Sequence, residues 1–360
     1  MQDRRTFIKK SGLFVAATTL PIPNFLLHKN KEKLGVALLG LGNYSTGQLA
    51  PALQETDYCE LRGIVTGSPE KIPVWQKKYG IKDQNVYNYD NMDEIANNDD
   101  IDVIYIVVPT GLHAKYAIKA ANAGKHVWCE KPMAKTSEEC RQIIEACNKN
   151  GVKLSIGYRM QHEKNTQTVM KWAETKPFGK MKNLKAEAGY YGDPMNPWKL
   201  EKEMGGGAMY DMGVYPLNAA RYTTGLEPIS VSAKHIINRP EIFDEVDETT
   251  VFDLEFPNGI TANCRTSFGE SMNNLEVDCK DGWYYLRPFQ SYSGVKGKAS
   301  DGTVLAPFRK NQQAVQMDDD ALAIINDKKV MVPGEDGLKD IIILEKIYES
   351  ASKNGERLSL

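Results

Sequence analysis

Hydrophobic and polar residues follow one pattern from residue 33 to about residue 158 and a different pattern after about residue 180. In the first region, nearly continuous apolar runs are separated by segments in which apolar residues recur at helical spacing. Such runs are typical of strands buried on both faces of a parallel sheet, and the intervening segments are typical of crossover helices. The pattern predicts an α/β, Rossmann-type dinucleotide-binding domain over residues 31–158. Its predicted strands are Leu34–Leu39, Leu61–Val65, Val103–Val108, His126–Cys129 and Leu154–Gly157, and its predicted helices are Gln48–Gln54, Pro69–Tyr79, Ala114–Ala123 and Ser137–Asn148.

In the second region apolar and polar residues alternate. Alternation over Thr249–Phe256, Ile260–Thr266 and Leu275–Cys279 predicts strands of an antiparallel sheet, with a hairpin turn at Pro257-Asn258-Gly259. Helical spacing over Ile341–Ser350 predicts a terminal helix, which we expect to pack back on the first domain. Residues 159–360 are therefore predicted to form an α+β domain for substrate binding and oligomerisation.

The first 30 residues differ from both regions. An arginine pair, Arg4-Arg5, precedes Phe-Ile-Lys, and the mild apolar stretch that follows is interrupted by Pro21 and Pro23. This arrangement predicts a twin-arginine export signal over residues 1–30 and hence a periplasmic protein. The alternative is a basic, frayed N-terminus on a cytoplasmic protein.

Composition and charge exclude several classes of protein. Lys and Arg number 45 against 47 Asp and Glu, for a formal net charge of -2, so the cationic excess expected of a nucleic-acid binder is missing. Beyond residue 30 no apolar run approaches the roughly 18 to 20 residues that a membrane span needs. The six cysteines include no C-x-x-C pair, and the five histidines show no metal-binding spacing, so we expect neither a disulfide framework nor a metal site.

A glycine turn follows the first predicted strand and opens a helix. Gly40 and Gly42 permit a tight turn and close approach of the backbone to a pyrophosphate, which would lie against Asn43, Tyr44 and Ser45 at the helix N-terminus. The third position of this fingerprint is Ser45 rather than Gly or Ala, which we expect to loosen the packing of helix on strand. Its place in the first strand–helix turn makes the motif a dinucleotide site.

The end of the second predicted strand indicates which dinucleotide binds. It lacks the acidic residue that accepts a hydrogen bond from the ribose of NAD and instead carries Thr66, Ser68 and Lys71. Hydroxyl groups and a cation favour the 2′-phosphate of NADP. The alternative is that these residues only cap the helix beginning near Pro69, which would suit either cofactor.

Two further strands end in polar residues at the edge where ligands bind in an open α/β sheet. Pro109, Thr110 and His113 follow one of them, and Glu130-Lys131-Pro132 follows the next. We expect Pro109, Thr110, His113, Glu130 and Lys131 to contact the cofactor. A lysine at this edge can hydrogen-bond a substrate hydroxyl.

The third motif is a glycine run, Gly205-Gly206-Gly207, followed by Asp211 and Tyr215. Four residues apart on an α-helix, Asp211 and Tyr215 would share one face. A lysine ammonium beside a phenol favours the phenolate, so Lys131 and Tyr215 together are a candidate proton shuttle. The alternative is a core tyrosine and an aspartate at a helix N-terminus.

The order of these motifs, with Gly157-Tyr158-Arg159 between the second and third, resembles the glucose–fructose oxidoreductase/inositol dehydrogenase (Gfo/Idh/MocA) family, and within it the exported glucose–fructose type. The resemblance covers the chain from about residue 33 to its end. It implies a Rossmann domain followed by a domain with a large, open, mainly antiparallel sheet through which dimers or tetramers form. It also implies that Lys131, Asp211 and Tyr215 are catalytic, and that the cofactor is contacted by Thr66, Lys71, Tyr89, Arg159, Trp198 and Lys199.

We therefore expect an exported NADP-dependent sugar oxidoreductase in which Tyr215 removes a hydroxyl proton with help from Lys131 while Asp211 orients the sugar. Export without a supply of free NADP(H) suggests a tightly bound cofactor that is recycled by a second sugar. Three alternatives remain: a glycosidase that acts through transient oxidation of the sugar, an ordinary sugar dehydrogenase or reductase, and a non-catalytic binding protein.

Overall fold

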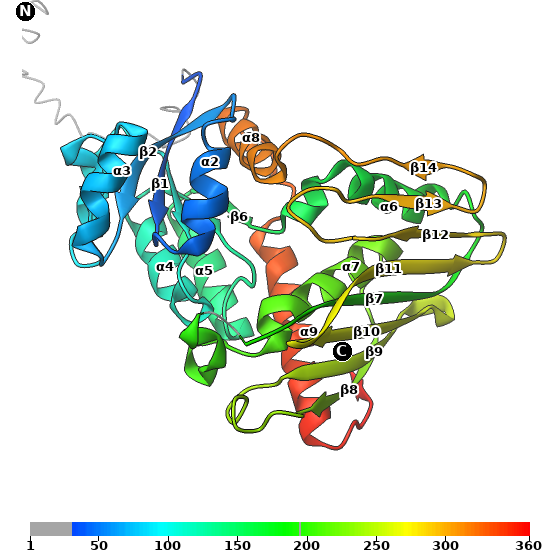
Figure 1. Cartoon of the computed structure of the whole chain (residues 1–360). Helices are drawn as coiled ribbons and strands as arrows, with labels where there is room; N and C mark the ends of the chain where they lie inside the picture. The colour runs from blue at the N-terminus through cyan, green and yellow to red at the C-terminus, as the bar shows by residue number, and fades with distance from the viewer. Residues whose placement is uncertain (1–30, 194–195) are drawn as a thin grey trace, which may run out of the picture.

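The computed structural model describes residues 31–193 and 196–360, which form two sheets with helices around them (Figure 1). The predicted export signal over residues 1–30 lies outside the described residues. The N-terminal sheet is entirely parallel, with strand order β3-β2-β1-β4-β5-β6, which confirms the predicted Rossmann-like fold. Its strands are β1 (Leu34–Leu39), β2 (Cys59–Val65), β3 (Val86–Tyr87), β4 (Val103–Ile106), β5 (His126–Cys129) and β6 (Leu154–Ile156).

Helices follow these strands much as the apolar spacing predicts, but several begin with a turn of different geometry. The helix expected over Gln48–Gln54 begins earlier, as a π-helix η1 (Ser45–Leu49) that continues into α2 (Ala50–Ala52). Short 3-10 helices, η2 (Pro69–Lys71) and η5 (Thr110–Leu112), precede the next two. The remaining helices of this domain are α3 (Ile72–Tyr79), α4 (His113–Asn122) and α5 (Ser137–Lys149), with the 3-10 turns η3 (Asp83–Asn85) and η4 (Met92–Asn97).

The second sheet has nine strands in the order β14-β13-β12-β11-β7-β10-β9-β8-β15. Every neighbouring pair is antiparallel except β7 and β10, so the sheet is mixed and mostly antiparallel, as expected. The turn predicted at Pro257-Asn258-Gly259 joins β9 to β10, and Asn258 and Gly259 both have positive φ, as the tight hairpin requires. The strands are β7 (Met181–Tyr191), β8 (Ser230–Ile236), β9 (Thr249–Glu255), β10 (Thr261–Ser267), β11 (Gly269–Cys279), β12 (Trp283–Leu286), β13 (Gly297–Ala299), β14 (Val304–Leu305) and β15 (Leu358–Ser359).

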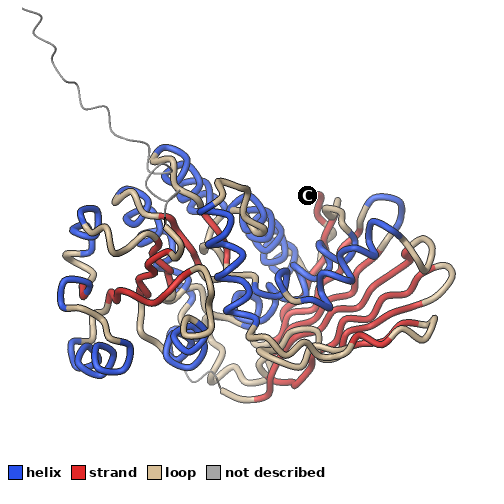
Figure 2. The backbone as a smooth tube through the Cα atoms, turned by 90° about the horizontal axis from the view of Figure 1, so that it is seen from above, coloured by secondary structure: helices blue, strands red, loops and turns tan. Residues whose placement is uncertain are grey.

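Helices cover one face of this sheet and leave the other uncovered (Figure 2). The covering helices are α6 (Lys164–Thr175), α7 (Val214–Thr224) and α9 (Gly334–Ser352). Along β7 the alternation is plain: Leu184, Ala186 and Ala188 are fully buried, whereas Lys185 and Glu187 between them form an ion pair. The uncovered face is therefore largely polar.

The C-terminal part of the chain returns to the first domain. Helix α8 (Gln312–Ile325), which the sequence pattern did not reveal, places Ala314, Met317 and Ala321 in the same buried cluster as β1. Helix α9 is longer than predicted and lies against α5, where Glu345 accepts a hydrogen bond from the backbone of Ser137 (2.7 Å).

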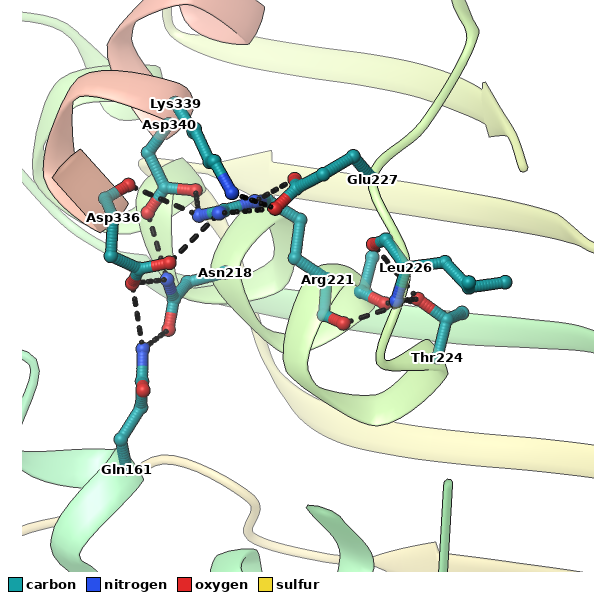
Figure 3. A network of polar contacts seen from close by, with 10 residues as sticks. Gln161, Asn218, Arg221, Thr224, Leu226, Glu227, Asp336, Lys339 and Asp340 are labelled. Carbon is teal, nitrogen blue, oxygen red and sulfur yellow. Dashed lines mark hydrogen bonds and ion pairs between the residues drawn. The ribbon is translucent and has the colours of Figure 1, made fainter. Parts of the chain in front are cut away.

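A buried ion-pair network fixes α7 to α9 (Figure 3). Arg221 of α7, which is 5% exposed, pairs with Glu227 (2.7 Å), Asp336 (2.8 Å) and Asp340 (2.6 Å). Gln161, from the turn that also carries Arg159, donates to Asp336 (3.0 Å). The helix layer and the end of the Rossmann domain are thus one connected unit.

No helix in the described part of the chain is long and apolar enough to cross a membrane.

Candidate active site

The glycine turn has the geometry that a bound pyrophosphate requires. Gly40 has φ +96°, and a side chain there would meet the carbonyl oxygen of Val107 at 2.5 Å. A Cβ on Gly42 would have nothing within 4 Å, so this position opens onto free space at the helix N-terminus, where backbone N–H groups lack helical acceptors. Ser45 does not loosen the packing as expected: it is fully buried, and its hydroxyl donates to the carbonyl of Gly40 (2.5 Å).

The residues at the end of β2 lie beside this turn. The ammonium of Lys71 donates to the carbonyl of Leu41 (2.9 Å), so the cation stands between the second strand and the glycine turn. The buried Thr66 hydroxyl accepts from the backbone N–H of Ser68 (3.1 Å). The ring of Tyr89 packs against Gly67, the residue between Thr66 and Ser68. These groups and the absence of an acid from the strand's tip suit an NADP ribose phosphate.

His113 and Glu130, both predicted to contact cofactor, direct their polar atoms into the protein. The ring nitrogens of His113 each lie 2.8 Å from a backbone carbonyl, of Val108 and of Pro132, so the ring joins the two loops at the sheet edge. Burial lowers the pKa of His113. Glu130 is 7% exposed, accepts from the hydroxyl of Tyr105 (2.7 Å), and has its pKa raised by burial.

Lys131, Asp211 and Tyr215 converge above this buried layer. The ammonium of Lys131 donates to the backbone carbonyl of Asp211 (2.7 Å) and lies 4.6 Å from the centre of the Tyr215 ring. Lys199 forms an ion pair with the carboxylate of Asp211 (2.6 Å), and both side chains are mostly buried. Tyr190 also hydrogen-bonds Asp211; burial and that carboxylate raise its pKa. Lys199, expected at the cofactor, thus lies beside the candidate catalytic residue Asp211, with the Trp198 ring 6.0 Å from its ammonium.

The helix that carries Asp211 and Tyr215 is not a single α-helix. Residues Met209–Gly213 form a π-helix, η9, which passes into α7. A side chain at Gly213 would come within 2.5 Å of the sulfur of Met209 and within 2.9 Å of Thr266. The prediction that the two residues share a face assumed α-helical spacing; here the wide turn sets their positions, and such turns are frequent at functional sites.

Asp247, which no sequence signal marked, holds the start of this π-helix. Its carboxylate accepts from the backbone N–H of Met209 (2.9 Å) and from the hydroxyls of Thr250 (2.6 Å) and Tyr348 (2.5 Å). Gly207 leaves room for that carboxylate, because a Cβ there would collide with it. Two other glycines bring the run against its neighbours: Gly205 packs on Thr110, and Gly206 on the backbone of Lys199.

Arg159 and aromatic residues close the space between the glycine turn and Tyr215. Arg159 is 2% exposed, and its guanidinium carbon lies 5.6 Å from the ring centre of Tyr215 and 4.8 Å from that of Tyr292. Tyr44 of the glycine turn lies 5.9 Å from Tyr292. Tyr292 was not predicted, because it lies on an irregular loop far along the chain.

These residues fit a dinucleotide. The glycine turn is open where a pyrophosphate would lie, Thr66 and Lys71 stand at the ribose end, and Lys131 and Tyr215 stand at the reacting end. Among the described residues no group of three or more His, Cys, Asp or Glu could hold a metal ion. A surface cavity of about 840 Å³ lies elsewhere, beside Trp172, Phe178 and Tyr284, and contains none of the candidate catalytic residues.

Comparison with known proteins agrees with this fold. Residues 34–158 match the model of an oxidoreductase family with an NAD-binding Rossmann fold (GFO_IDH_MocA), and residues 166–285 match a C-terminal domain of the same family. The structure of an aldose-aldose oxidoreductase from Caulobacter crescentus is 37% identical and superposes with a TM-score of 0.87, covering 91% of this chain and 100% of that one. A D-xylose 1-dehydrogenase [NADP(+)] from Haloarcula marismortui is 28% identical over 88% of this chain and 90% of its own length. An oxidoreductase from Agrobacterium radiobacter in complex with NAD+ shares the fold at 18% identity, with a TM-score of 0.76 and coverage of 91% and 98% of the two chains.

Proposed function

The chain belongs to the GFO/IDH/MocA oxidoreductase family, and from that premise we propose that it is an NADP-dependent sugar oxidoreductase acting on an aldose hydroxyl. The observation that carries this proposal is the convergence of Lys131, Asp211 and Tyr215 on a fold that also presents an open glycine turn for a pyrophosphate. A sugar bound there would meet a phenol, an ammonium and a carboxylate, the groups that alcohol–carbonyl chemistry needs.

Each of these side chains has a distinct task. When bound, NADP+ supplies the hydride acceptor. In the oxidative direction the deprotonated Tyr215 oxygen takes the hydroxyl proton of the sugar and becomes the phenol, and in the reductive direction that phenol returns the proton. Lys131 uses one N–H on the carbonyl of Asp211, which fixes its ammonium over the Tyr215 ring and leaves two N–H groups for the sugar oxygen. The carboxylate of Asp211, held by Lys199, accepts hydrogen bonds from neighbouring sugar hydroxyls and orients them.

We propose NADP(H) rather than NAD(H) because Lys71 and Thr66 stand at the end of β2 without an acid. We predict that NADP(H) binds at least tenfold more tightly than NAD(H), a difference of about 1.4 kcal/mol. Lys71→Ala should reduce that ratio by removing the cation that faces the 2′-phosphate. Titration of nucleotide fluorescence with both cofactors measures it, and equal affinities in the parent protein would contradict the proposal.

We further propose that the nucleotide stays bound and is recycled, so that one sugar is oxidised and a second is reduced at the same Lys131 and Tyr215. The similarity to an aldose-aldose oxidoreductase supports this, as does the twin-arginine pattern at Arg4-Arg5, which suggests a periplasmic protein that is exported folded. The purified protein should carry NADP(H) through gel filtration and show ping-pong kinetics without added cofactor. A protein that purifies empty and turns over only with excess nucleotide would instead be an ordinary dehydrogenase, like the xylose enzyme it resembles.

We propose that the uncovered face of the nine-stranded sheet joins copies of the chain into a homodimer or homotetramer. Its polar residues, such as the Lys185 and Glu187 pair, would then meet across the interface. Analytical ultracentrifugation measures the mass directly, and a monomer at micromolar concentration would contradict the proposal.

A further inference from the structure

The loop between β12 and β13 extends from the second sheet to the glycine turn of the first domain. Its base is held firmly: Arg287 donates from its backbone to Lys296 (2.8 Å), and Phe289 is fully buried. The side-chain oxygen of Asn273 on β11 accepts from the backbone N–H groups of Phe289 and Gln290 (3.0 Å each). The base of this loop is thus anchored to the sheet, and its tip presents Tyr292.

At the tip, Tyr292 completes a row of four side chains that joins the two domains. The row runs from Tyr44 to Tyr292 (5.9 Å between ring centres), then to Arg159 (4.8 Å) and to Tyr215 (5.6 Å). The loop backbone adds a further bond, because the carbonyl of Ser291 accepts from Arg159 (3.1 Å). Arg159 is nearly fully buried, whereas Tyr292 is 49% exposed, so Tyr292 is the outermost member of the row.

The row lies along the path that a dinucleotide must take. One end, Tyr44, is on the first turn of the helix whose N-terminus would hold the pyrophosphate. The other end, Tyr215, is at the reacting cluster. A nucleotide that joins these two points has to lie beside the row, and the half-exposed Tyr292 stands between it and solvent.

We propose that Tyr292 is a nucleotide-retention residue: its ring covers the nicotinamide half of bound NADP(H), and separation of Tyr292 from Tyr44 limits the rate at which the nucleotide leaves. This inference rests on the proposed function, since it requires that the chain binds NADP(H). It adds a residue of the second domain to a site that the Rossmann motif alone would assign to the first.

The test is to measure the rate at which NADPH dissociates from the variant Tyr292→Ala. The rate is read from the loss of nucleotide fluorescence after excess NADP+ is added as a chase. We expect the rate to rise at least tenfold, with the melting temperature of the nucleotide-free protein unchanged because the side chain is half exposed. Tyr292→Phe keeps the ring and should release NADPH at the parent rate. Trp283→Ala on β12, a large aromatic residue 43% exposed on the same domain, is the matched control and should also leave the rate unchanged.

The outcomes separate this inference from the proposed function. If the parent protein binds NADPH and Tyr292→Ala releases it at the parent rate, the retention role is wrong while the proposed function stands. A similar acceleration in Trp283→Ala would also overturn the role, because the effect would not be specific to Tyr292. If the parent protein binds neither NADPH nor NADP+, the proposed function and this inference fail together.

Discussion

Lys131 is fixed from two sides, by the carbonyl of Asp211 and by the face of Tyr215. A lysine side chain left free would sample many rotamers and would have to be ordered at each turnover. Here the same short helix that supplies Tyr215, the proposed acid–base residue, also orders the ammonium. The cluster is therefore arranged before any substrate binds, which is the condition under which acid–base groups act efficiently.

At this scale the first prediction concerns Tyr215→Phe. The substitution removes only the phenolic O–H and keeps the ring that lies beneath Lys131, so the cluster should remain ordered. We expect kcat to fall by roughly 10²- to 10⁴-fold, the usual contribution of general acid–base catalysis, with nucleotide affinity almost unchanged. Steady-state kinetics with the preferred aldose measures this. A variant that keeps more than half of the parent activity would show that another group carries the proton.

Individual residues differed in how far the sequence could reveal them. Lys131, Asp211 and Tyr215 are brought together as expected, since Lys131 follows a buried strand and the other two follow a glycine run, both of which are visible in one sequence. The contacts of Lys199 with Asp211 and of Tyr292 with Tyr44 were not visible, because each depends on how the folded chain brings separate segments together.

Among the elements, both helices that open onto the site begin with a π-turn. Each π-turn lies where the chain leaves glycine-rich backbone: η1 after Gly40 and Gly42, and η9 after Gly205–Gly207. The sequence pattern predicted helices there, but not their geometry, because the wide turn of η9 depends on packing between Gly213 and β10 and on a carboxylate supplied by Asp247. Helix α8 escaped prediction because the acidic run Asp318–Asp320 interrupts its apolar spacing.

At the scale of secondary-structure elements, the prediction concerns the stability of the variant Asp247→Ala. The variant would leave three donors without an acceptor: the buried backbone N–H of Met209, the buried hydroxyl of Thr250 and the partly buried hydroxyl of Tyr348. At about 1–3 kcal/mol for each unsatisfied group, the free energy of unfolding should fall by about 3 kcal/mol or more. Urea unfolding measures it.

Tyr348→Phe provides the comparison, since it removes a single hydrogen bond and should cost only about 1 kcal/mol. Equal losses in the two variants would mean that Asp247 does not hold the start of η9.

At the scale of the whole molecule, the fold consists of two sheets, and segments from the C-terminal part of the chain pack back on the first domain. Residues 31–158 form the parallel sheet, but α8 comes from the far end of the chain and completes the hydrophobic cluster on β1. Helix α8 also carries Asp320, a fully buried residue whose carboxyl group faces His162 and Ser155. Burial raises the pKa of Asp320 to about 6, against the opposing influence of His162.

That raised pKa predicts how stability depends on pH. In the unfolded chain an aspartate has a pKa of about 3.9, so between pH 4 and pH 6 the folded state binds more protons. The contribution of Asp320 to the free energy of unfolding therefore falls as pH rises through this range and stays low above pH 6. Asp320→Asn should remove this dependence, so that the variant gains stability over the parent at pH 7 more than at pH 5.

Melting temperatures at pH 5, 6 and 7 for the parent, Asp320→Asn and the exposed control Asp244→Asn measure the effect. Parallel pH curves for the parent and Asp320→Asn would mean that Asp320 does not titrate in the folded protein over this range.

The return of α8 to β1 also sets an order of events during synthesis on the ribosome. The segment that carries the glycine turn is made first, yet the hydrophobic cluster on β1 lacks Ala314, Met317 and Ala321 until every strand of the second sheet from β7 to β14 and then α8 have left the exit tunnel. Until then η1, α2 and α3 would cover β1 only in part, and the surface that α8 occupies would be open to chaperones and to other chains. The hydrophobic core of the first domain is therefore completed late, when translation is nearly finished.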